Sequence, residues 1–266
     1  GNEVEPSIAV DPTNPNRMVI GWRQFDSVLS DFRQAGWAYT TDGGQTWTFP
    51  GVIDPGVLRS DPVIDADAEG NFYYNSLSPD AGYACTVFKS TDGGATWDTG
   101  TFAWGGDKAW QAIDTTNSPG RGNIYIAWSA GDSICSPMEF TRSTDGGHTF
   151  EACTAIAEHP YWGTIAVGPD GEVYACGYGF VVAKSVNAKY AGQTPQCTHS
   201  YVSLDGLMVG WIGPNPGGLT GQAWVAVDSS SGPTHGYVYL LCSVQRNSII
   251  DPCDLMFARS NDGGQT

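Results

Sequence analysis

Thr40-Thr-Asp42-Gly-Gly44-Gln-Thr46-Trp47 is the stretch that determines the fold, because close copies of it recur along the 266 residues. Two copies also end in an aromatic residue: Ser90-Thr-Asp92-Gly-Gly94-Ala-Thr96-Trp97 and Ser143-Thr-Asp145-Gly-Gly147-His-Thr149-Phe150. Another is Ser260-Asn-Asp262-Gly-Gly264-Gln-Thr266, and a weaker one is Ser203-Leu-Asp205-Gly206. We call each copy an Asp turn. The five Asp residues are 50, 53, 60 and 57 residues apart, a spacing typical of an array of small β units.

The chemistry of the Asp turn predicts a closed β-hairpin. A short Asp side chain can accept hydrogen bonds from backbone N–H groups two residues on, and glycine supplies the positive φ of a tight turn. The flanking residues alternate as in strands, for example Gly36-Trp-Ala-Tyr-Thr40 and Cys85-Thr-Val-Phe-Lys-Ser90. We therefore interpret these Asp residues as structural staples, and we expect each terminal Trp or Phe to cover a neighbouring core.

The Asp turns resemble the Asp-box (BNR) repeat of sialidases and related β-propellers, and the copies extend over nearly the whole chain. The resemblance implies an all-β fold, a β-propeller of four-stranded antiparallel blades with an Asp turn between the third and fourth strands. The same repeat occurs in xyloglucanase-type hydrolases, sorting receptors and photosystem assembly factors. It therefore implies a fold without specifying an activity.

A second repeat predicts the innermost strand of each blade. Its copies begin near residues 5, 59, 108, 162 and 222, as in Glu5-Pro-Ser-Ile-Ala-Val-Asp11 and Lys108-Ala-Trp-Gln-Ala-Ile-Asp114. We expect one propeller domain over residues 1–266, with about five blades. Because the fifth blade reaches Thr266 before a fourth strand, the expectation is a part of a six- or seven-bladed propeller.

Charge and cysteine content narrow the possible partners and the cellular setting. Twelve Lys and Arg against 28 Asp and Glu give a formal charge of -16, which disfavours nucleic acid and anionic membranes as partners. The sequence contains no run of 18 apolar residues, so no membrane span is expected. Seven cysteines favour a secreted protein, with buried thiols as the alternative. The predicted disulfides are Cys176–Cys197 and Cys242–Cys253, with Cys135–Cys153 as a third candidate that leaves Cys85 unpaired.

The first residues of the inner strands are expected at the mouth of the central channel, beside the variable loops. Acids and indoles that converge there would suit a sugar, because rings pack on Trp and hydroxyls bond to carboxylates. The candidate catalytic carboxylates are Glu5, Asp61 and Asp26. The candidate substrate-binding residues are Arg23, Arg59, Lys108, Trp110, Gln111, Trp162 and Trp224. No cofactor is expected except possible Ca²⁺ binding by Asp61, Asp65 and Asp67, for which a β-turn role of Asp67 is the alternative.

The resemblance to sialidases also implies what an active site of that family would contain. Sialidases hold the substrate carboxylate with three arginines, the first in a Phe/Tyr-Arg-Ile/Leu-Pro motif before the first inner strand. This chain has Val4-Glu5-Pro6-Ser7 at that place, a carboxylate where a guanidinium is required. We therefore expect a secreted, sialidase-like propeller that acts on glycans as a glycoside hydrolase of another specificity. The alternative is a non-catalytic extracellular propeller that binds carbohydrate or protein, and the oligomeric state stays open.

Overall fold

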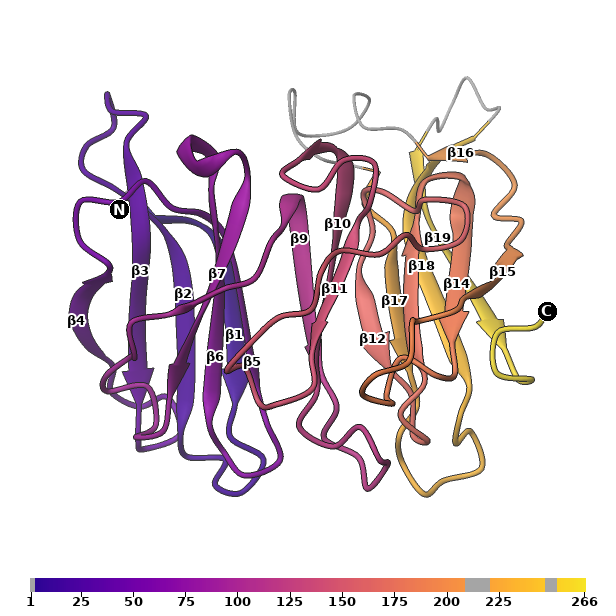
Figure 1. Ribbon diagram of the computed structural model, residues 1–266, viewed down its shortest axis with the longest axis horizontal. Coiled ribbons are helices and arrows are strands. Elements are labelled where there is room, and N and C mark those ends of the chain that lie inside the picture. The colour runs from indigo at the N-terminus through magenta and orange to yellow at the C-terminus, as the bar shows by residue number, and fades with distance from the viewer. Residues whose placement is uncertain (1–2, 209–220, 247–252) are drawn as a thin grey trace.

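Five antiparallel sheets follow one another along the chain in the computed structural model, which describes residues 3–208, 221–246 and 253–266 (Figure 1). The first three consist of β1 (Glu3–Val10), β2 (Met18–Phe25), β3 (Arg33–Thr40) and β4 (Thr48–Ile53); β5 (Ser60–Ala66), β6 (Phe72–Ser78), β7 (Ala84–Ser90) and β8 (Thr101–Phe102); and β9 (Gly106–Ile113), β10 (Ile124–Ser133) and β11 (Phe140–Ser143). The fourth consists of β12 (Ile165–Val167), β13 (Val173–Gly177), β14 (Val181–Ser185) and β15 (Thr198–Tyr201). In the fifth, β18 (Val238–Gln245) pairs with β16 (Leu207–Met208), β17 (Trp224–Val227) and β19 (Cys253–Ser260).

The sheets stand side by side in chain order, from indigo to yellow in Figure 1. The inner strands β1, β5, β9, β12 and β17 are neighbours in that order. Four apolar cores fill the spaces between successive sheets. This arrangement confirms the predicted propeller of four-stranded antiparallel blades. The described residues contain only two short 3-10 turns, η1 (Pro79–Ala81) and η2 (Tyr178–Phe180), and no helix among them is long and apolar enough to cross a membrane.

The Asp turns at Asp42, Asp92, Asp145 and Asp262 follow the third strand of their sheets, and the first two of them lead into a fourth strand. Each is held by the side chain of its Asp. In the first turn Thr46 donates to Asp42 twice, from its backbone N–H to Oδ1 at 2.9 Å and from its hydroxyl to Oδ2 at 2.6 Å. The donor thus lies four residues on, not two as expected. Hydrogen bonds from Thr46 lower the pKa of Asp42 to about 2. Asp92, Asp145 and Asp262 repeat the two bonds.

The aromatic residues of the second and third turns cover neighbouring cores, as predicted. Trp97 packs between the first two sheets, with its ring centroid 5.7 Å from that of Tyr74 and 6.5 Å from that of Trp37. Phe150 packs on the core between the second and third sheets. Each of these turns therefore connects its own sheet to the preceding one.

The turn of the fourth sheet lies at Ser185–Asn187, so the prediction at Asp205 is wrong. The hydroxyl of Ser185 donates to Asn187 Oδ1 at 3.0 Å, and that oxygen also accepts the N–H of Gln196 at 2.8 Å. Asn187 thus replaces the usual Asp between β14 and β15. Asp205 lies between β15 and β16, where its carboxylate pairs with Arg246 at 2.7 Å.

Side-chain oxygens link successive inner strands. Ser7 Oγ accepts the N–H of Ile64, and Asp65 Oδ2 accepts the N–H of Ile113, both at 2.9 Å. Thr164 Oγ1 accepts the N–H of Val225 at 2.9 Å. These bonds satisfy backbone donors that the sheets themselves leave unpaired.

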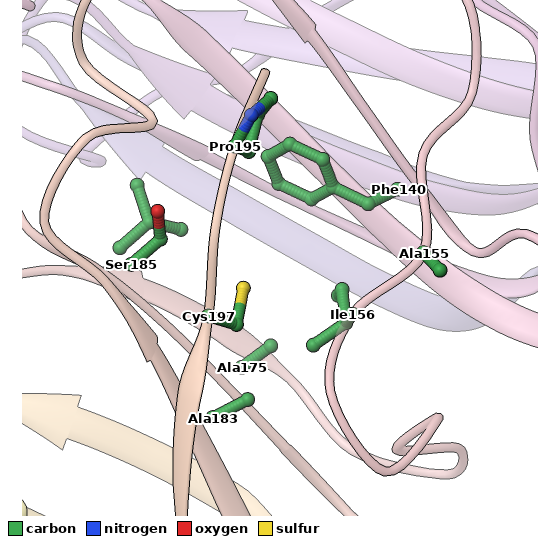
Figure 2. A pocket seen from close by; sticks show the side chains of 9 residues that line it. Phe140, Ala155, Ile156, Ala175, Ala183, Ser185, Pro195 and Cys197 are labelled. Atoms are coloured by element: carbon green, nitrogen blue, oxygen red, sulfur yellow. The ribbon is translucent and has the colours of Figure 1, made fainter. Parts of the chain in front are cut away.

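Among the described residues, one disulfide forms, between Cys135 and Cys153, whereas the pairs Cys176–Cys197 and Cys242–Cys253 do not. Cys197 lines a small apolar pocket between the third and fourth sheets, together with Phe140 and Ile156 (Figure 2). Cys176 belongs to the core on the other face of the fourth sheet. Cys242 lies opposite Met256 rather than Cys253, which lies three positions earlier, at the start of β19. Both predicted pairs are therefore wrong. Cys176 and Cys197 lie on opposite faces of the fourth sheet, and Cys242 and Cys253 lie at different positions along their strands.

Candidate functional site

One strained backbone position recurs at the start of four successive inner strands. Glu5, Asp61, Lys108 and Trp162 have φ values of 56°, 47°, 57° and 56°, in the left-handed region that residues other than glycine rarely adopt. The strand ladder is irregular at the first three, between Val4 and Ser7, between Ser60 and Val63, and between Asp107 and Trp110. Such a position costs on the order of 1 kcal/mol or more, and such positions cluster at functional sites. We call this end of the inner strands the upper rim, which is uppermost in Figure 1.

Charged side chains from three sheets meet at the upper rim. Glu5 of β1 forms an ion pair with Arg23 of β2, and its carboxyl group lies within hydrogen-bonding reach of that of Asp61 on β5. Lys108 Nζ of β9 lies 3.4 Å from Asp61 Oδ2 and 3.2 Å from Asp107 Oδ1. The structure thus brings together Glu5, Asp61, Arg23 and Lys108, four of the predicted residues. We call these four residues and Asp107 the rim cluster.

The surroundings within the rim cluster shift the pKa values of Glu5 and Asp61 in opposite directions. Burial, followed by the neighbouring Asp61 carboxylate, raises the pKa of Glu5. Burial opposes ionisation of Asp61 as well, but the Lys108 ammonium and the Ser60 hydroxyl outweigh it and lower the pKa of Asp61. The Ser60 hydroxyl donates to Asp61 Oδ1 at 2.6 Å. Glu5 therefore holds its proton more tightly than Asp61 does.

Two indole rings lie beside the cluster. Trp110 follows Lys108 by two residues on β9, and its ring meets that of Trp224 on β17 edge to face, with centroids 4.8 Å apart. The two rings belong to the inner strands of the third and fifth sheets. Trp224 is 49% exposed and offers an apolar surface to a ligand.

The fourth left-handed residue, Trp162, joins a separate aromatic group with Tyr161 and Tyr178. The rings of Tyr161 and Tyr178 are stacked, with centroids 4.9 Å apart, and the Trp162 ring lies 5.3 Å from that of Tyr161. A small pocket of about 230 Å³, its open mouth included, is lined by Lys108, Tyr161 and Trp162. The pocket connects this aromatic group to the rim cluster.

Arg59, Gln111 and Asp26 do not join the rim cluster. The guanidinium of Arg59 is buried, lies 2.7 Å from the carboxylate of Asp54 and packs over the ring of Phe88. The residue of the second inner strand that lies at the rim is therefore Asp61, not Arg59. Gln111 is buried and donates to the carbonyl of Tyr73 at 3.4 Å. Asp26 is exposed in the loop after β2, where Gln34 donates to it at 3.4 Å. The predictions for Arg59 and Gln111 placed two buried side chains at a surface.

The candidate calcium ligands are spread along one strand. Asp61 lies near the start of β5, whereas Asp65 and Asp67 lie at its other end. Asp65 accepts the N–H groups of Ala66 and Ile113. Asp67 accepts the N–H groups of Glu69 and Asn71, as the β-turn alternative predicts. No group of three or more His, Cys, Asp or Glu with metal-binding geometry occurs in the described part of the chain.

Residues that the sequence did not point to complete the site. Arg33 Nε donates to Ser60 Oγ at 3.2 Å, which orients the hydroxyl that binds Asp61. Asp107, Tyr161 and Tyr178 flank predicted residues, yet no repeat marks them. The one usable signal is position, because Asp107 and Tyr161 immediately precede the left-handed residues Lys108 and Trp162.

Comparison with known proteins shows the fold. No protein-family model matches the sequence, and a search of curated proteins finds no match. A leech intramolecular trans-sialidase is similar in structure, with a TM-score of 0.56, 11% identity, and coverage of 95% of this chain and 60% of that one. A GH74 xyloglucanase from Xanthomonas campestris has a TM-score of 0.53 and 17% identity over 97% of this chain and 37% of that one. YCF48 bound to D1 peptide has a TM-score of 0.50 and 16% identity over 98% of this chain and 64% of that one. At these identities the likeness extends to the β-propeller fold alone.

Proposed function

We propose that this chain binds a glycan at the upper rim, over the rim cluster and the adjoining indole pair. The observation that carries the proposal is the meeting of Glu5, Asp61 and Lys108. Two residues after Lys108 on the same strand, Trp110 contacts the half-exposed ring of Trp224. Sugars present hydroxyls at their edges and apolar C–H faces, and this surface offers partners for both.

The charge of the rim cluster favours a neutral glycan. Arg23 already pairs with Glu5, and Lys108 pairs with Asp61 and Asp107. A carboxylated sugar would have to displace these acids from their cations, whereas hydroxyl groups can bond to paired charges without separating them. The preference expected is therefore for uncharged sugars over sialylated ones.

Glycoside hydrolysis is the second candidate function, favoured by the opposite pKa shifts of Glu5 and Asp61. A protonated acid beside an ionised carboxylate is the pair that such hydrolysis uses. The two carboxyls of retaining enzymes stand about 5–5.5 Å apart, and those of inverting enzymes stand further apart. Glu5 and Asp61 are within hydrogen-bonding reach, so a substrate would have to part them. Binding without turnover is therefore the function that the geometry supports best.

An extracellular setting belongs to the same proposal. The Cys135–Cys153 disulfide supports it, because disulfides persist in oxidising compartments. The negative formal charge of -16 is compatible with meeting neutral polysaccharide surfaces.

Binding of neutral and sialylated oligosaccharides, measured by titration calorimetry, tests the proposal. Trp224→Ala should weaken binding of a neutral glycan by roughly tenfold, the equivalent of about 1.4 kcal/mol. Trp47→Ala is the matched control, because Trp47 is 41% exposed but lies in an Asp turn on the opposite rim. No binding of any neutral glycan, or equal loss in both variants, would refute glycan binding at this rim. Release of the aryl group from aryl glycosides, abolished in Asp61→Asn, would establish hydrolysis instead.

A further inference from the structure

We infer that the glycan site continues onto a second aromatic surface formed by Tyr161 and Tyr178, so that its ligand is an oligosaccharide of at least two sugar residues. The inference rests on the proposed function and specifies its ligand. It starts from two aromatic surfaces on one rim, the Trp110–Trp224 pair and the Tyr161–Tyr178 stack. Lys108 precedes Trp110 by two residues on β9 and lines the pocket beside Tyr161.

Both tyrosines present ring surface to solvent. Tyr161 is 37% exposed and Tyr178 is 45% exposed, although their rings are stacked on each other with an angle of 13° between the planes. Trp162 supports both rings, at 74° to Tyr161 and 85° to Tyr178. The exposed ring surface is therefore backed by aromatic packing and can receive the apolar face of a sugar.

The backbone holds this surface in place. The N–H of Tyr178 donates to the carbonyl of Tyr161 at 2.7 Å. The two segments pass so closely that a Cβ on Gly177 would lie 2.5 Å from the backbone nitrogen of Tyr161. A Cβ on Gly163 would lie 1.8 Å from the carbonyl oxygen of Cys176. A surface fixed before binding loses little entropy on binding, which favours affinity.

Lys108 connects the two aromatic surfaces. Its ammonium belongs to the rim cluster, and its side chain also lines the pocket walled by Tyr161 and Trp162. A chain of sugars that packs on Trp224 can therefore hydrogen-bond to Lys108 and continue to the tyrosines. A single sugar would contact only one of the two aromatic surfaces.

The dependence of affinity on glycan length tests this inference. A neutral monosaccharide, disaccharide and tetrasaccharide of one series are titrated into the full chain. The tetrasaccharide should bind between about twofold and tenfold more tightly than the monosaccharide, as expected for one added aromatic contact of about 0.5–1.5 kcal/mol. Tyr178→Ala should abolish this gain, whereas Tyr178→Phe should retain the gain because the ring is kept.

Tyr190→Ala is the matched control, because Tyr190 is 39% exposed and follows the turn on the opposite rim. Thermal unfolding of each variant establishes that the sheets remain folded. Equal affinity for all three lengths, or equal loss for all three in Tyr178→Ala, would overturn the second surface and leave the proposed function standing. Failure of every length to bind would overturn both.

Discussion

Replacement of Asp65 tests the links between inner strands, because its carboxylate is buried between β5 and β9. The carboxylate accepts the N–H of Ile113 at 2.9 Å and that of Ala66 at 2.8 Å, and no cation is among the groups that shift its pKa. Burial raises the pKa of Asp65 to about 6, and the neighbouring Asp67 carboxylate contributes in the same direction. Asp65→Asn keeps an oxygen acceptor at this place and removes the titration.

The sign of the effect follows from the two pKa values. In the folded chain the Asp65 carboxyl has a pKa of about 6, against its ordinary value of 3.8. The folded state therefore binds the proton more tightly than the unfolded state. The protonated Asp65 carboxyl therefore contributes its full stabilisation of the folded state below about pH 4, and this contribution is lost as the pH rises to about 6. At about 1.36 kcal/mol for each pKa unit, the difference between the two pKa values corresponds to roughly 3 kcal/mol in the free energy of unfolding.

Urea denaturation of the protein and of Asp65→Asn, followed by tryptophan fluorescence between pH 4 and pH 7.5, measures this contribution. The free energy of unfolding of the protein relative to the variant should fall by roughly 3 kcal/mol across this range. Asp42→Asn is the control and should give a constant difference, because the pKa of Asp42 is about 2 and lies below the whole range. A constant difference for Asp65→Asn as well would refute the burial of an ionised carboxylate between these strands.

Three further substitutions test the cores and the turns. Trp97→Ala should lower the free energy of unfolding by about 3 kcal/mol, because its ring fills the space between the first two sheets, and urea denaturation measures the loss. Replacement of Cys135 and Cys153 by Ser should cost about 3 kcal/mol by releasing a loop with a sequence separation of 18, and reduction of the unaltered protein should cost the same. Asn187→Asp should lower stability by about 1 kcal/mol in thermal unfolding, since Asp cannot replace the amide that donates to the Thr194 carbonyl at 3.0 Å; an unchanged midpoint would contradict that role.

The propeller could be predicted because the Asp turn is a local structure. All its bonds connect residues within a few positions, as between Asp42 and Thr46, so the pattern survives in the sequence. The turn of the fourth sheet was missed because Asn187 performs the hydrogen bonding of the usual Asp without the following Gly and Thr. Asp205 and Gly206 match part of the Asp-turn sequence pattern, but Asp205 pairs with Arg246 and does not form such a turn.

The site was predicted in part, because the inner-strand repeat locates Glu5 and Lys108 but not the backbone geometry at their positions. The left-handed residue of the second sheet is Asp61, and the predicted start at Arg59 lies two residues too early. No residue type marks this geometry, since none of its four occupants is a glycine. Disulfide pairing failed for a related reason, because it depends on which sheet face each Cys occupies.

The four left-handed positions give the scaffold a modular means of changing what it recognises. An acid, a second acid, an amine and an indole occupy the same backbone geometry in successive sheets. The buried apolar clusters between the first four sheets contain none of these residues, and Trp162 packs against the edge of the cluster between the fourth and fifth sheets. Substitution of one of these four residues should therefore change the ligand preference without changing the fold. The backbone strain at the position is present whichever non-glycine residue stands there.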